Sequence, residues 1–372
     1  MTTNAFESNP APSAASTRSH PSHIPSLDGI RAVSFLIVFL SHAGLKGMVP
    51  GYFGLSVFFF LSGYLITTLL RLEFDQHKNI SLKQFYLRRA FRILPPFYLV
   101  LIVAYLLTGL GAWREGSLSA PAVTSQLLHY VNYYIIQHGW WEGIAPGTWV
   151  YWSLAVEEHF YLLFPLIYLW LRKRGCSSRQ QAVVLIGLCA LVLAWRCFLV
   201  FVMDAPKDRL YIASDTRVDS ILAGCLLAVW QNPVIDRQAI SDRRLGLLWL
   251  PVGAVMVLVS LVIRRPDFEQ SFRYTLQSFG LLPLFIAAIR WHDRLPFRWL
   301  NTGVAKYLGV LSYAMYLTHT TVIWGVDDRV KLPDAVRAVL SLVIVIAVST
   351  LIHRLVERPF AKLRRRFGSR EA

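Results

Sequence analysis

Charged residues are scarce in this sequence. They make up 16% of its 372 residues, whereas a soluble domain usually carries about 25%. This deficit argues against a soluble enzyme. The 55% share of hydrophobic residues also argues against disorder, which needs low hydrophobicity together with high charge.

Cysteine is equally rare. The four cysteines, at positions 176, 189, 197 and 225, form no Cys-x-x-Cys pair and no metal-ligand spacing. Three of them lie in apolar runs, where a free cysteine behaves as a small hydrophobic residue. We therefore expect neither a structural disulfide nor a metal site. An internal repeat and an alternating apolar pattern are also missing, which argues against a repeat protein and a closed β-barrel.

Long apolar runs are what the sequence does contain. A bilayer core of about 30 Å needs about 20 apolar residues per helix. The segments that qualify are residues 30–45, 51–71, 92–112, 148–171, 181–203, 211–230, 245–263, 273–290, 304–325 and 335–356. The segment 122–138 is apolar, but it is short and is interrupted by polar residues. We therefore expect a re-entrant or interfacial helix, with an eleventh span as the alternative. The sequence thus predicts an all-α, polytopic membrane bundle of about ten transmembrane helices.

Basic residues outnumber acidic ones, 38 to 22, for a net charge of +16. Such an excess is typical either of nucleic-acid-binding proteins or of the cytoplasmic loops of membrane proteins. With ten spans, 24 of the Lys and Arg residues fall on the side of both termini and nine on the other side. This bias predicts cytoplasmic N- and C-termini in the inner membrane and makes a nucleic-acid partner unnecessary.

The ends of the chain differ from its apolar middle. Residues 1–26 are rich in Ser, Ala, Pro and Thr without apolar periodicity, so we expect a flexible cytoplasmic tail. The run that begins at Ile30 is similar to a signal peptide, but many more apolar runs follow, and we interpret it as a retained first span. We expect a transmembrane domain over residues 27–360 and a basic cytoplasmic tail over 361–372.

Ionisable side chains inside spans are functional candidates because each is costly in lipid. Arg31 and His42 lie eleven residues apart in the first span, which puts them on one helix face, about 16 Å apart along the axis. A histidine can take a proton from a hydroxyl group. Asp28, just before the apolar run, is well placed to cap the helix.

A cationic cluster precedes the third span. Arg88, Arg89 and Arg92 occur in the segment FYLRRAFRILPPFY, and the last two are neighbours on one helix face. Arginine forks suit the oxygens of phosphate groups. Judged by spacing alone, the cluster is explained equally well by the positive charge that cytoplasmic loops ordinarily carry.

The fourth span holds two adjacent glutamates, Glu157 and Glu158. They cannot both be cheaply ionised in a bilayer, so each needs a partner or a changed pKa. Ser153, Glu157 and Tyr161 share a helix face, and Trp152 marks an interface or lines a cavity.

Polar residues recur in the sixth and ninth spans. Arg217 and Asp219 open the sixth span, and an ion pair between this arginine and one of the two glutamates is a plausible partnership. Ser312, Tyr316 and His319 share one face of the ninth span.

Seven motifs resemble, in their order along the chain, the membrane-bound acyltransferase 3 family. They are LDGIRA-x10-H, GYFGLSVFFFLSGYLI, RRAFRILPPFY, WSLAVEEHFYLLFP, TRVDSILAG, LSYAMYLTH and ERPF. The resemblance covers about residues 26–360. It implies transfer of an acyl group, commonly acetyl, from cytoplasmic acyl-CoA to a hydroxyl of a sugar, polysaccharide or glycolipid. The chain ends about twelve residues after ERPF, which implies a form without the C-terminal hydrolase-like domain of many relatives.

The resemblance also implies roles for residues. His42 is the expected base or acyl carrier, aligned with Arg31 and oriented by Glu157 or Glu158 as in catalytic triads. The phosphates of CoA are expected at Arg89 and Arg92, with Arg88 nearby. The expected substrate-contacting or supporting residues are Trp152, Ser153, Tyr161, Arg217, Asp219, Tyr313, Tyr316 and His319.

The sequence leaves several points open. A transporter or flippase for a lipid-linked sugar would also keep charges at mid-depth, although no repeat is visible. A small molecule such as a macrolide is an alternative acceptor. Trp140 and Trp141 could stack on a sugar ring or anchor the chain at the membrane interface. Acyl length and oligomeric state are not readable.

Overall fold

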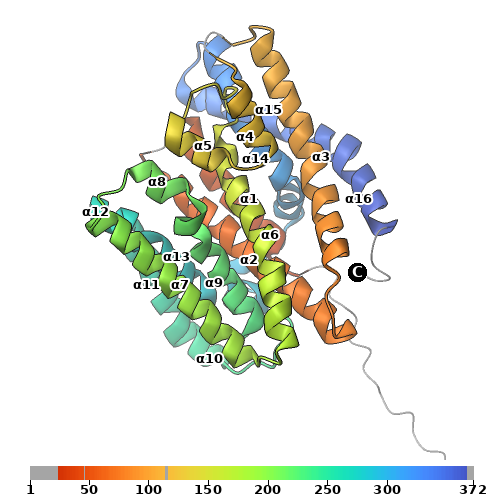
Figure 1. Ribbon diagram of the computed structural model, residues 1–372, viewed down its shortest axis with the longest axis vertical. Coiled ribbons are helices and arrows are strands. Elements are labelled where there is room, and N and C mark those ends of the chain that lie inside the picture. Colours follow the sequence, from red (N-terminus) through yellow and green to blue (C-terminus); the bar gives the residue numbers. More distant parts are fainter. Residues whose placement is uncertain (1–23, 46, 114–115, 367–372) are drawn as a thin grey trace, which may run out of the picture.

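The protein is a helical bundle in a computed structural model that describes residues 24–45, 47–113 and 116–366 (Figure 1). Across these ranges the regular structure is helical, without strands. The α-helices are α1 (Leu27–Leu40), α2 (Gly51–His77), α3 (Leu82–Gly109), α4 (Ala120–Leu127), α5 (Val131–His138), α6 (Trp152–Lys173), α7 (Ser178–Phe201), α8 (Lys207–Ile212), α9 (Ser214–Val229), α10 (Asp242–Arg244), α11 (Leu250–Val262), α12 (Pro266–Gln270), α13 (Arg273–Arg290), α14 (Gly303–Arg329), α15 (Asp334–Ile352) and α16 (Arg358–Arg366).

Seven helical segments of the described chain are long and apolar enough to cross a membrane, so the protein is an integral membrane protein. They are Leu27–Leu45, Gly51–His77, Leu82–Gly109, Trp149–Lys173, Ser178–Phe201, Asp242–Val262 and Asp334–Leu363. Helices α9, α13 and α14 coincide with the other three predicted spans but do not meet those criteria. The predicted count of about ten is therefore not confirmed.

Helix α9 shows why a hydropathy count and the fold differ. It has 16 residues, of which 13 are buried, and at 1.5 Å per residue it is shorter than the apolar core of a bilayer. It packs against α2, α7 and α13. A helix enclosed by other helices can keep polar side chains that a lipid-facing helix cannot.

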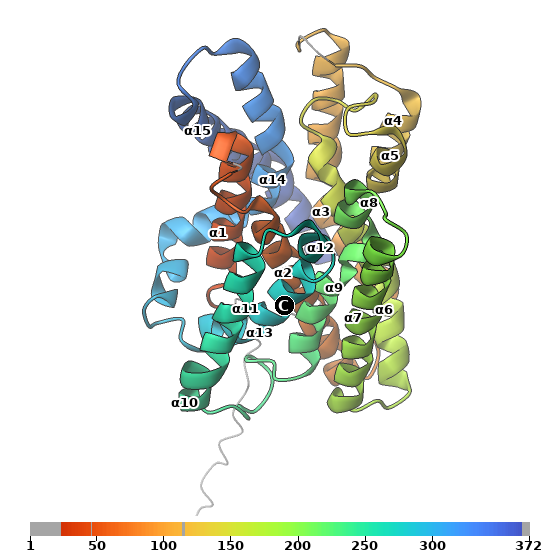
Figure 2. The same cartoon turned by 90° about the vertical axis from the view of Figure 1, so that its left-hand side faces the viewer.

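Helix α2 lies at the centre of the bundle, between α9 on one side and α1 on the other (Figure 2). Two glycines set the approach of α2 to α9. A Cβ atom on Gly63 would collide with the backbone oxygen of Ile221, and one on Gly224 would collide with that of Phe60. Small residues at facing positions let membrane helices approach closely.

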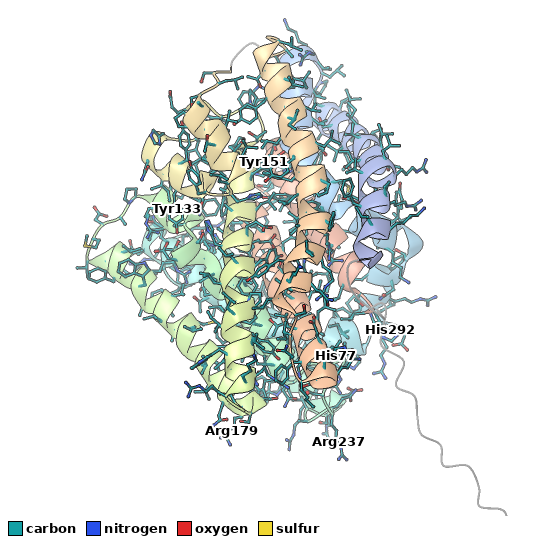
Figure 3. All side chains as sticks on the ribbon, turned by 45° about the vertical axis from the view of Figure 1, so that its right-hand side comes forward. His77, Tyr133, Tyr151, Arg179, Arg237 and His292 are labelled. Atoms are coloured by element: carbon teal, nitrogen blue, oxygen red, sulfur yellow. The ribbon has the colours of Figure 1, made fainter. Side chains whose placement is uncertain are left out.

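The loops alternate between the two ends of the bundle. Figure 3 shows His77, Arg179, Arg237 and His292 toward one end and Tyr133 and Tyr151 toward the other. His77 ends α2 and Arg179 lies in the first turn of α7, whereas Arg237 follows α9 and His292 follows α13. The loops predicted to share one side of the membrane therefore do lie at one end.

The segment predicted as one re-entrant or interfacial helix is in fact two short helices, α4 and α5, at the end of the molecule opposite α10 (Figure 1). They are separated by His129, whose φ is +57°. Each has eight residues, which is about 12 Å of helix. Neither can cross a bilayer, so the alternative of an eleventh span is wrong.

The predicted tails lie mostly outside the described residues, but their inner ends are ordered. Ser26 is buried, and its hydroxyl donates to the carbonyl oxygen of Ala288 at 2.6 Å. Ser26 also precedes α1 directly, so the expectation that Asp28 caps this helix is wrong: Asp28 lies in its first turn. At the other end, α16 extends into the predicted basic tail and packs on α3.

Candidate functional site

A cavity of about 230 Å³ lies among α1, α2, α3, α6 and α14. We call it the arginine cavity. Its apolar wall comes mainly from α2, including Leu55, Phe58, Phe59, Leu61, Leu65, Ile66 and Leu69. Its polar wall consists of Arg31, Ser62, Arg89, Arg92, Ser153, Glu157, Glu158, Tyr161, Ser312, Tyr313 and Tyr316. Ten predicted residues from four helices thus meet at one place.

The arginines of this cavity differ in their partners. Arg31 donates to Asp28 at 2.8 Å and is neutralised. Among the described residues, Arg89 and Arg92 form no ion pair, although Glu157 and Glu158 line the same cavity. The guanidinium of Arg89 lies 5.1 Å from the ring centroid of Tyr161. Two guanidinium groups that form no ion pair suit an anionic ligand, and the carboxylates of Glu157 and Glu158 act on Arg89 from the same cavity.

Arg88 does not belong to this group. It is absent from the lining of the arginine cavity and donates to Glu73 at 2.7 Å. The helix starts at Leu82, earlier than the span predicted from residue 92. Arg88 therefore lies inside a regular helix. Its four-residue spacing from Arg92 would allow the two side chains to share a helix face, and it is the ion pair with Glu73 that keeps Arg88 out of the cluster.

A second pocket, of about 530 Å³, is formed by the loop after α5 and the C-terminal half of α14. We call it the tryptophan pocket. It is lined by His42, Trp141, Trp149, Thr320, Ile323, Trp324, Asp327 and Asp328. The rings of Trp141 and Trp324 have centroids 5.6 Å apart. Aromatic rings beside carboxylates suit a ligand that has both apolar faces and hydroxyl groups.

His42 is presented by a break in its helix. The first span was expected to be one straight helix, but residues Ser41–Leu45 form a π turn with non-helical torsions at Ala43 and Gly44. Such π turns are frequent at functional sites. Arg31 lines the arginine cavity, whereas His42 lines the tryptophan pocket. The two residues therefore line different cavities, in keeping with their expected separation along the helix axis.

His42 is joined to His319, which is fully buried. Nδ1 of His42 lies 2.9 Å from Nε2 of His319, and Nδ1 of His319 lies 2.7 Å from the carbonyl oxygen of Tyr316. Because a carbonyl only accepts, Nδ1 of His319 carries its hydrogen and Nε2 of a neutral His319 accepts from His42. Nε2 of His42 is then the unprotonated nitrogen, the atom that can take a proton.

The expected orienting role of the glutamates is not what the geometry shows. Glu157 and Glu158 line the arginine cavity, and the group bonded to Nδ1 of His42 is His319. Tyr316 connects the two regions, because its hydroxyl lies 2.5 Å from Oγ of Ser153 in the arginine cavity and its carbonyl holds His319. The path between the two cavities thus runs through Ser153, Tyr316 and the histidine pair.

Arg217 does not have the partner that was predicted for it, and Asp219 pairs elsewhere. The guanidinium of Arg217 lies 3.7 Å from the ring centroid of Tyr274, and it forms no ion pair with a glutamate among the described residues. Asp219 instead pairs with the buried Arg196 at 3.0 Å. The guanidinium carbon of Arg217 lies 6.0 Å from the ring centroid of Trp152. These residues belong to the packing between α6, α7, α9 and α13 and line neither of the two cavities.

Some residues of the site had no clear signal in the sequence. Trp324, Asp327 and Asp328 lie at the end of the ninth predicted span, where a tryptophan and two aspartates are also ordinary interface residues. Within the described residues no group of three His, Cys, Asp or Glu side chains is arranged to hold a metal ion.

Comparison with known proteins points in the same direction. A family profile described as an acyltransferase domain matches residues 24–354. The peptidoglycan O-acetyltransferase OatA of Listeria monocytogenes is 28% identical over 93% of this chain and 57% of its own length. The O-acetyltransferase OatA of Staphylococcus aureus is 26% identical over 92% of this chain and 58% of its own length.

The chain thus spans less than three fifths of the curated relatives it matches. No solved structure matches it. The family profile covers both cavities and the histidine pair between them. The chain belongs to the membrane acyltransferase 3 family.

Proposed function

We propose that this protein transfers an acyl group, most simply acetyl, from cytoplasmic acyl-CoA to a hydroxyl of a sugar, polysaccharide or glycolipid. The observation that supports this most is the position of the His42–His319 pair. Through Tyr316 it joins the arginine cavity, where Arg89 and Arg92 form no ion pair among the described residues, to a pocket lined by tryptophans. Transfer between two substrates needs such an arrangement, with one base between two binding sites.

The donor occupies the arginine cavity in this proposal. Arg89 and Arg92 engage the phosphates of CoA, and the apolar wall of α2 holds the pantetheine arm so that the thioester points toward Ser153 and Tyr316. Forked guanidinium groups match phosphate oxygens. Glu157 and Glu158 border the path and disfavour deeper entry of the phosphates.

The acceptor occupies the tryptophan pocket. Trp141, Trp149 and Trp324 offer faces for a sugar ring, and Asp327 can accept hydrogen bonds from hydroxyl groups. The name of the Listeria relative identifies its acceptor as peptidoglycan. A polysaccharide of this kind is the acceptor class that we propose for this chain.

The chemistry then follows from the tautomer of His42. Nε2 takes the proton of the acceptor hydroxyl while the oxygen attacks the thioester carbonyl carbon. The carbon–sulfur bond breaks, the thiolate of CoA leaves, and the proton held by His42 passes to it. His42 as a transient acyl carrier is the two-step form of the same reaction.

Turnover by purified protein tests the proposal. We expect the full chain in lipid nanodiscs to release CoA from acetyl-CoA when a sugar acceptor is present, and His42→Ala to lose about 10²–10⁴-fold in rate. A sugar transporter would move the sugar without releasing CoA. Mass spectrometry of surface polysaccharides from cells with and without the protein then identifies the acyl group and the acceptor.

The donor site has its own test with a matched control. Arg89→Gln with Arg92→Gln removes both guanidinium groups of the proposed phosphate site, so we expect the KM for acetyl-CoA to rise at least about tenfold with a smaller change in kcat. Arg88→Gln makes the same change one residue away, outside the cavity. An unchanged KM in the double variant, or an equal rise in Arg88→Gln, would contradict the docking of CoA at this cluster.

We also propose that residues 27–360 form the acyltransferase domain of an inner-membrane protein. The 24-to-9 bias of basic residues supports cytoplasmic termini, since the loops that carry most of these residues lie at one end of the bundle (Figure 3).

A further inference from the structure

Two buried arginines lie outside both cavities and have no part in the proposed reaction. Arg217 on α9 is 0% exposed and Arg273 on α13 is 5% exposed. Among the described residues, Nε and Nη2 of Arg217 and Nε of Arg273 have no hydrogen-bond acceptor. A buried donor without a partner has lost its hydrogen bonds to water without replacing them, which is unfavourable and more so when the donor is charged.

A third buried arginine shows what this bundle does when the role is structural. Arg196 on α7 is also 0% exposed. Its donors reach the carbonyl oxygens of Ser271 and Thr216, both at 2.6 Å, and the carboxylate of Asp219. Arg217 lies at the same exposure but makes a single bond of 3.3 Å, from Nη1 to the carbonyl oxygen of Tyr211.

Aromatic rings lie beside the planar guanidinium group of Arg217, but they do not satisfy the N–H groups along its edge. The ring centroids of Tyr274, Tyr211 and Phe59 lie 3.7, 5.4 and 5.6 Å from its guanidinium carbon. Such rings stabilise the charge from above and below the plane, whereas the N–H groups point outward within it. The two unused atoms, Nε and Nη2, lie on one edge and form the fork that binds a carboxylate or phosphate side-on.

Neighbouring side chains extend this set of donors. The guanidinium of Arg273 lies 4.4 Å from the ring centroid of Tyr52. The hydroxyl of Tyr52 and Nε2 of Gln277 also have no partner within the described chain. Gln277 is one helical turn beyond Arg273 and is held by Ser56 at 2.9 Å. Glu269 pairs with Arg273, so the cluster retains one uncompensated positive charge, that of Arg217.

We propose that Arg217, Arg273, Tyr52 and Gln277 form a buried binding site for an oxyanion, a carboxylate or a phosphate group. The site is separate from the docking of CoA at Arg89 and Arg92. Phe59 lies beside both, because it lines the arginine cavity and its ring centroid lies 5.6 Å from the guanidinium carbon of Arg217. The anion is either a free small oxyanion or an acidic group on a larger ligand, and binding to it does not depend on acyl transfer.

Thermal unfolding of the purified full chain in detergent tests the site. Sodium acetate, sodium phosphate and sodium glucuronate are compared with sodium chloride at equal ionic strength, and glucose serves as the neutral counterpart of glucuronate. We expect a saturable rise of several degrees in Tm with an oxyanion, because a ligand that binds only the folded state stabilises it. Acetate or phosphate responses identify a free small oxyanion, and a response to glucuronate alone identifies an acidic group on a larger ligand.

Two variants locate the response. Arg217→Gln is expected to lose it. Gln277→Glu keeps the size of the side chain and the contact with Ser56 but supplies a carboxylate, so we expect a higher starting Tm and no response to added oxyanion. Arg243→Gln removes an exposed charge from α10 and should respond as the unchanged protein does.

The proposal is wrong if no oxyanion raises the Tm above the value in sodium chloride. It is also wrong if Gln277→Glu lowers the starting Tm and its Tm still rises with added oxyanion. If Arg217→Gln does not fold, Gln277→Glu alone decides the question, since its two expected results are opposite to those of a purely structural cluster.

Discussion

At the scale of single residues, the proposed chemistry depends on which nitrogen of His42 carries hydrogen. The carbonyl of Tyr316 fixes the tautomer of His319, and His319 fixes that of His42. This is the role that a third group plays in catalytic triads, performed here by a second histidine.

Replacing His319 should therefore impair turnover without removing the base. We expect His319→Ala to lower kcat about 10²–10⁴-fold while the KM for acetyl-CoA stays near its original value, because the donor site lies elsewhere. The measurement is initial rates of CoA release from the purified variants. A His319→Ala enzyme with full kcat would show that His42 needs no orienting partner.

A second residue-scale prediction concerns the buried ion pair. Asp219→Asn leaves Arg196 buried without its carboxylate, which should cost about 3–5 kcal/mol of unfolding free energy. Asp267→Asn is the control. Asp267 pairs with Arg265, but their side chains are 56% and 80% exposed, and an exposed pair contributes about 0–1 kcal/mol. Thermal unfolding in detergent compares them, and equal Tm values would contradict the difference in burial.

The candidate residues were visible in the sequence because polar side chains stand out within apolar runs. Their partners were not. Arg217 was paired with a glutamate on the basis of charge alone, whereas it lies on Tyr274, which is more than fifty positions away. Periodicity gives the face of a helix, but the contact depends on how helices from distant parts of the chain pack.

At the scale of elements, α2 and α9 determine how tightly the centre of the bundle closes. Gly63 and Gly224 each face a backbone oxygen of the other helix. Phe59 and Ser62, which line the arginine cavity, lie on the same helix as this contact. The shape of the cavity therefore depends on the close approach of these two helices.

Adding one methyl group at this contact should disturb the bundle. We expect Gly224→Ala to destabilise the protein by about 1–3 kcal/mol, the usual cost of overpacking. Gly187→Ala on α7 is the matched control, since nothing lies within 4 Å of the added carbon, and it should be neutral or stabilising by up to about 1 kcal/mol. Tm values in detergent measure both, and a similar fall in the two variants would contradict the packing argument.

Hydropathy predicts the positions of the helices well, but it does not predict where a helix is interrupted. The ten apolar runs coincide with helices, but the π turn at His42 and the break at His129 carry no apolar signal. Ala43 and Gly44 leave the helical region just where the first span was expected to continue. The residues best placed for chemistry are thus presented by irregularities that periodicity overlooks.

At the scale of the whole molecule, the loops that hold most of the basic residues gather at one end of the bundle, and the tryptophan pocket lies toward Tyr151 and the other end (Figure 3). The proposed orientation places the first end in the cytoplasm. The donor would then enter from the side where acyl-CoA is made, and the acceptor from the side where surface polysaccharides lie.

Single cysteines test this orientation. In a variant whose four native cysteines are replaced by serine, we expect a cysteine at Arg179 to react with a membrane-impermeant maleimide only in inverted vesicles, and one at Trp141 only in intact cells. Both side chains are exposed, so accessibility does not favour either. The reverse labelling pattern would mean that the charge bias does not set the orientation.

The bond between Ser153 and Tyr316 has one more consequence for the cell. An enzyme that receives one substrate from each side of a membrane risks becoming a leak for protons and other ions. In this bundle the two cavities remain separate, because the tyrosine hydroxyl, held by Ser153 and by the carbonyl oxygen of Val150, lies with the buried His319 in the segment between them. In the proposed reaction the acyl group would pass this segment on its way to the acceptor, while the electrochemical gradient would stay insulated.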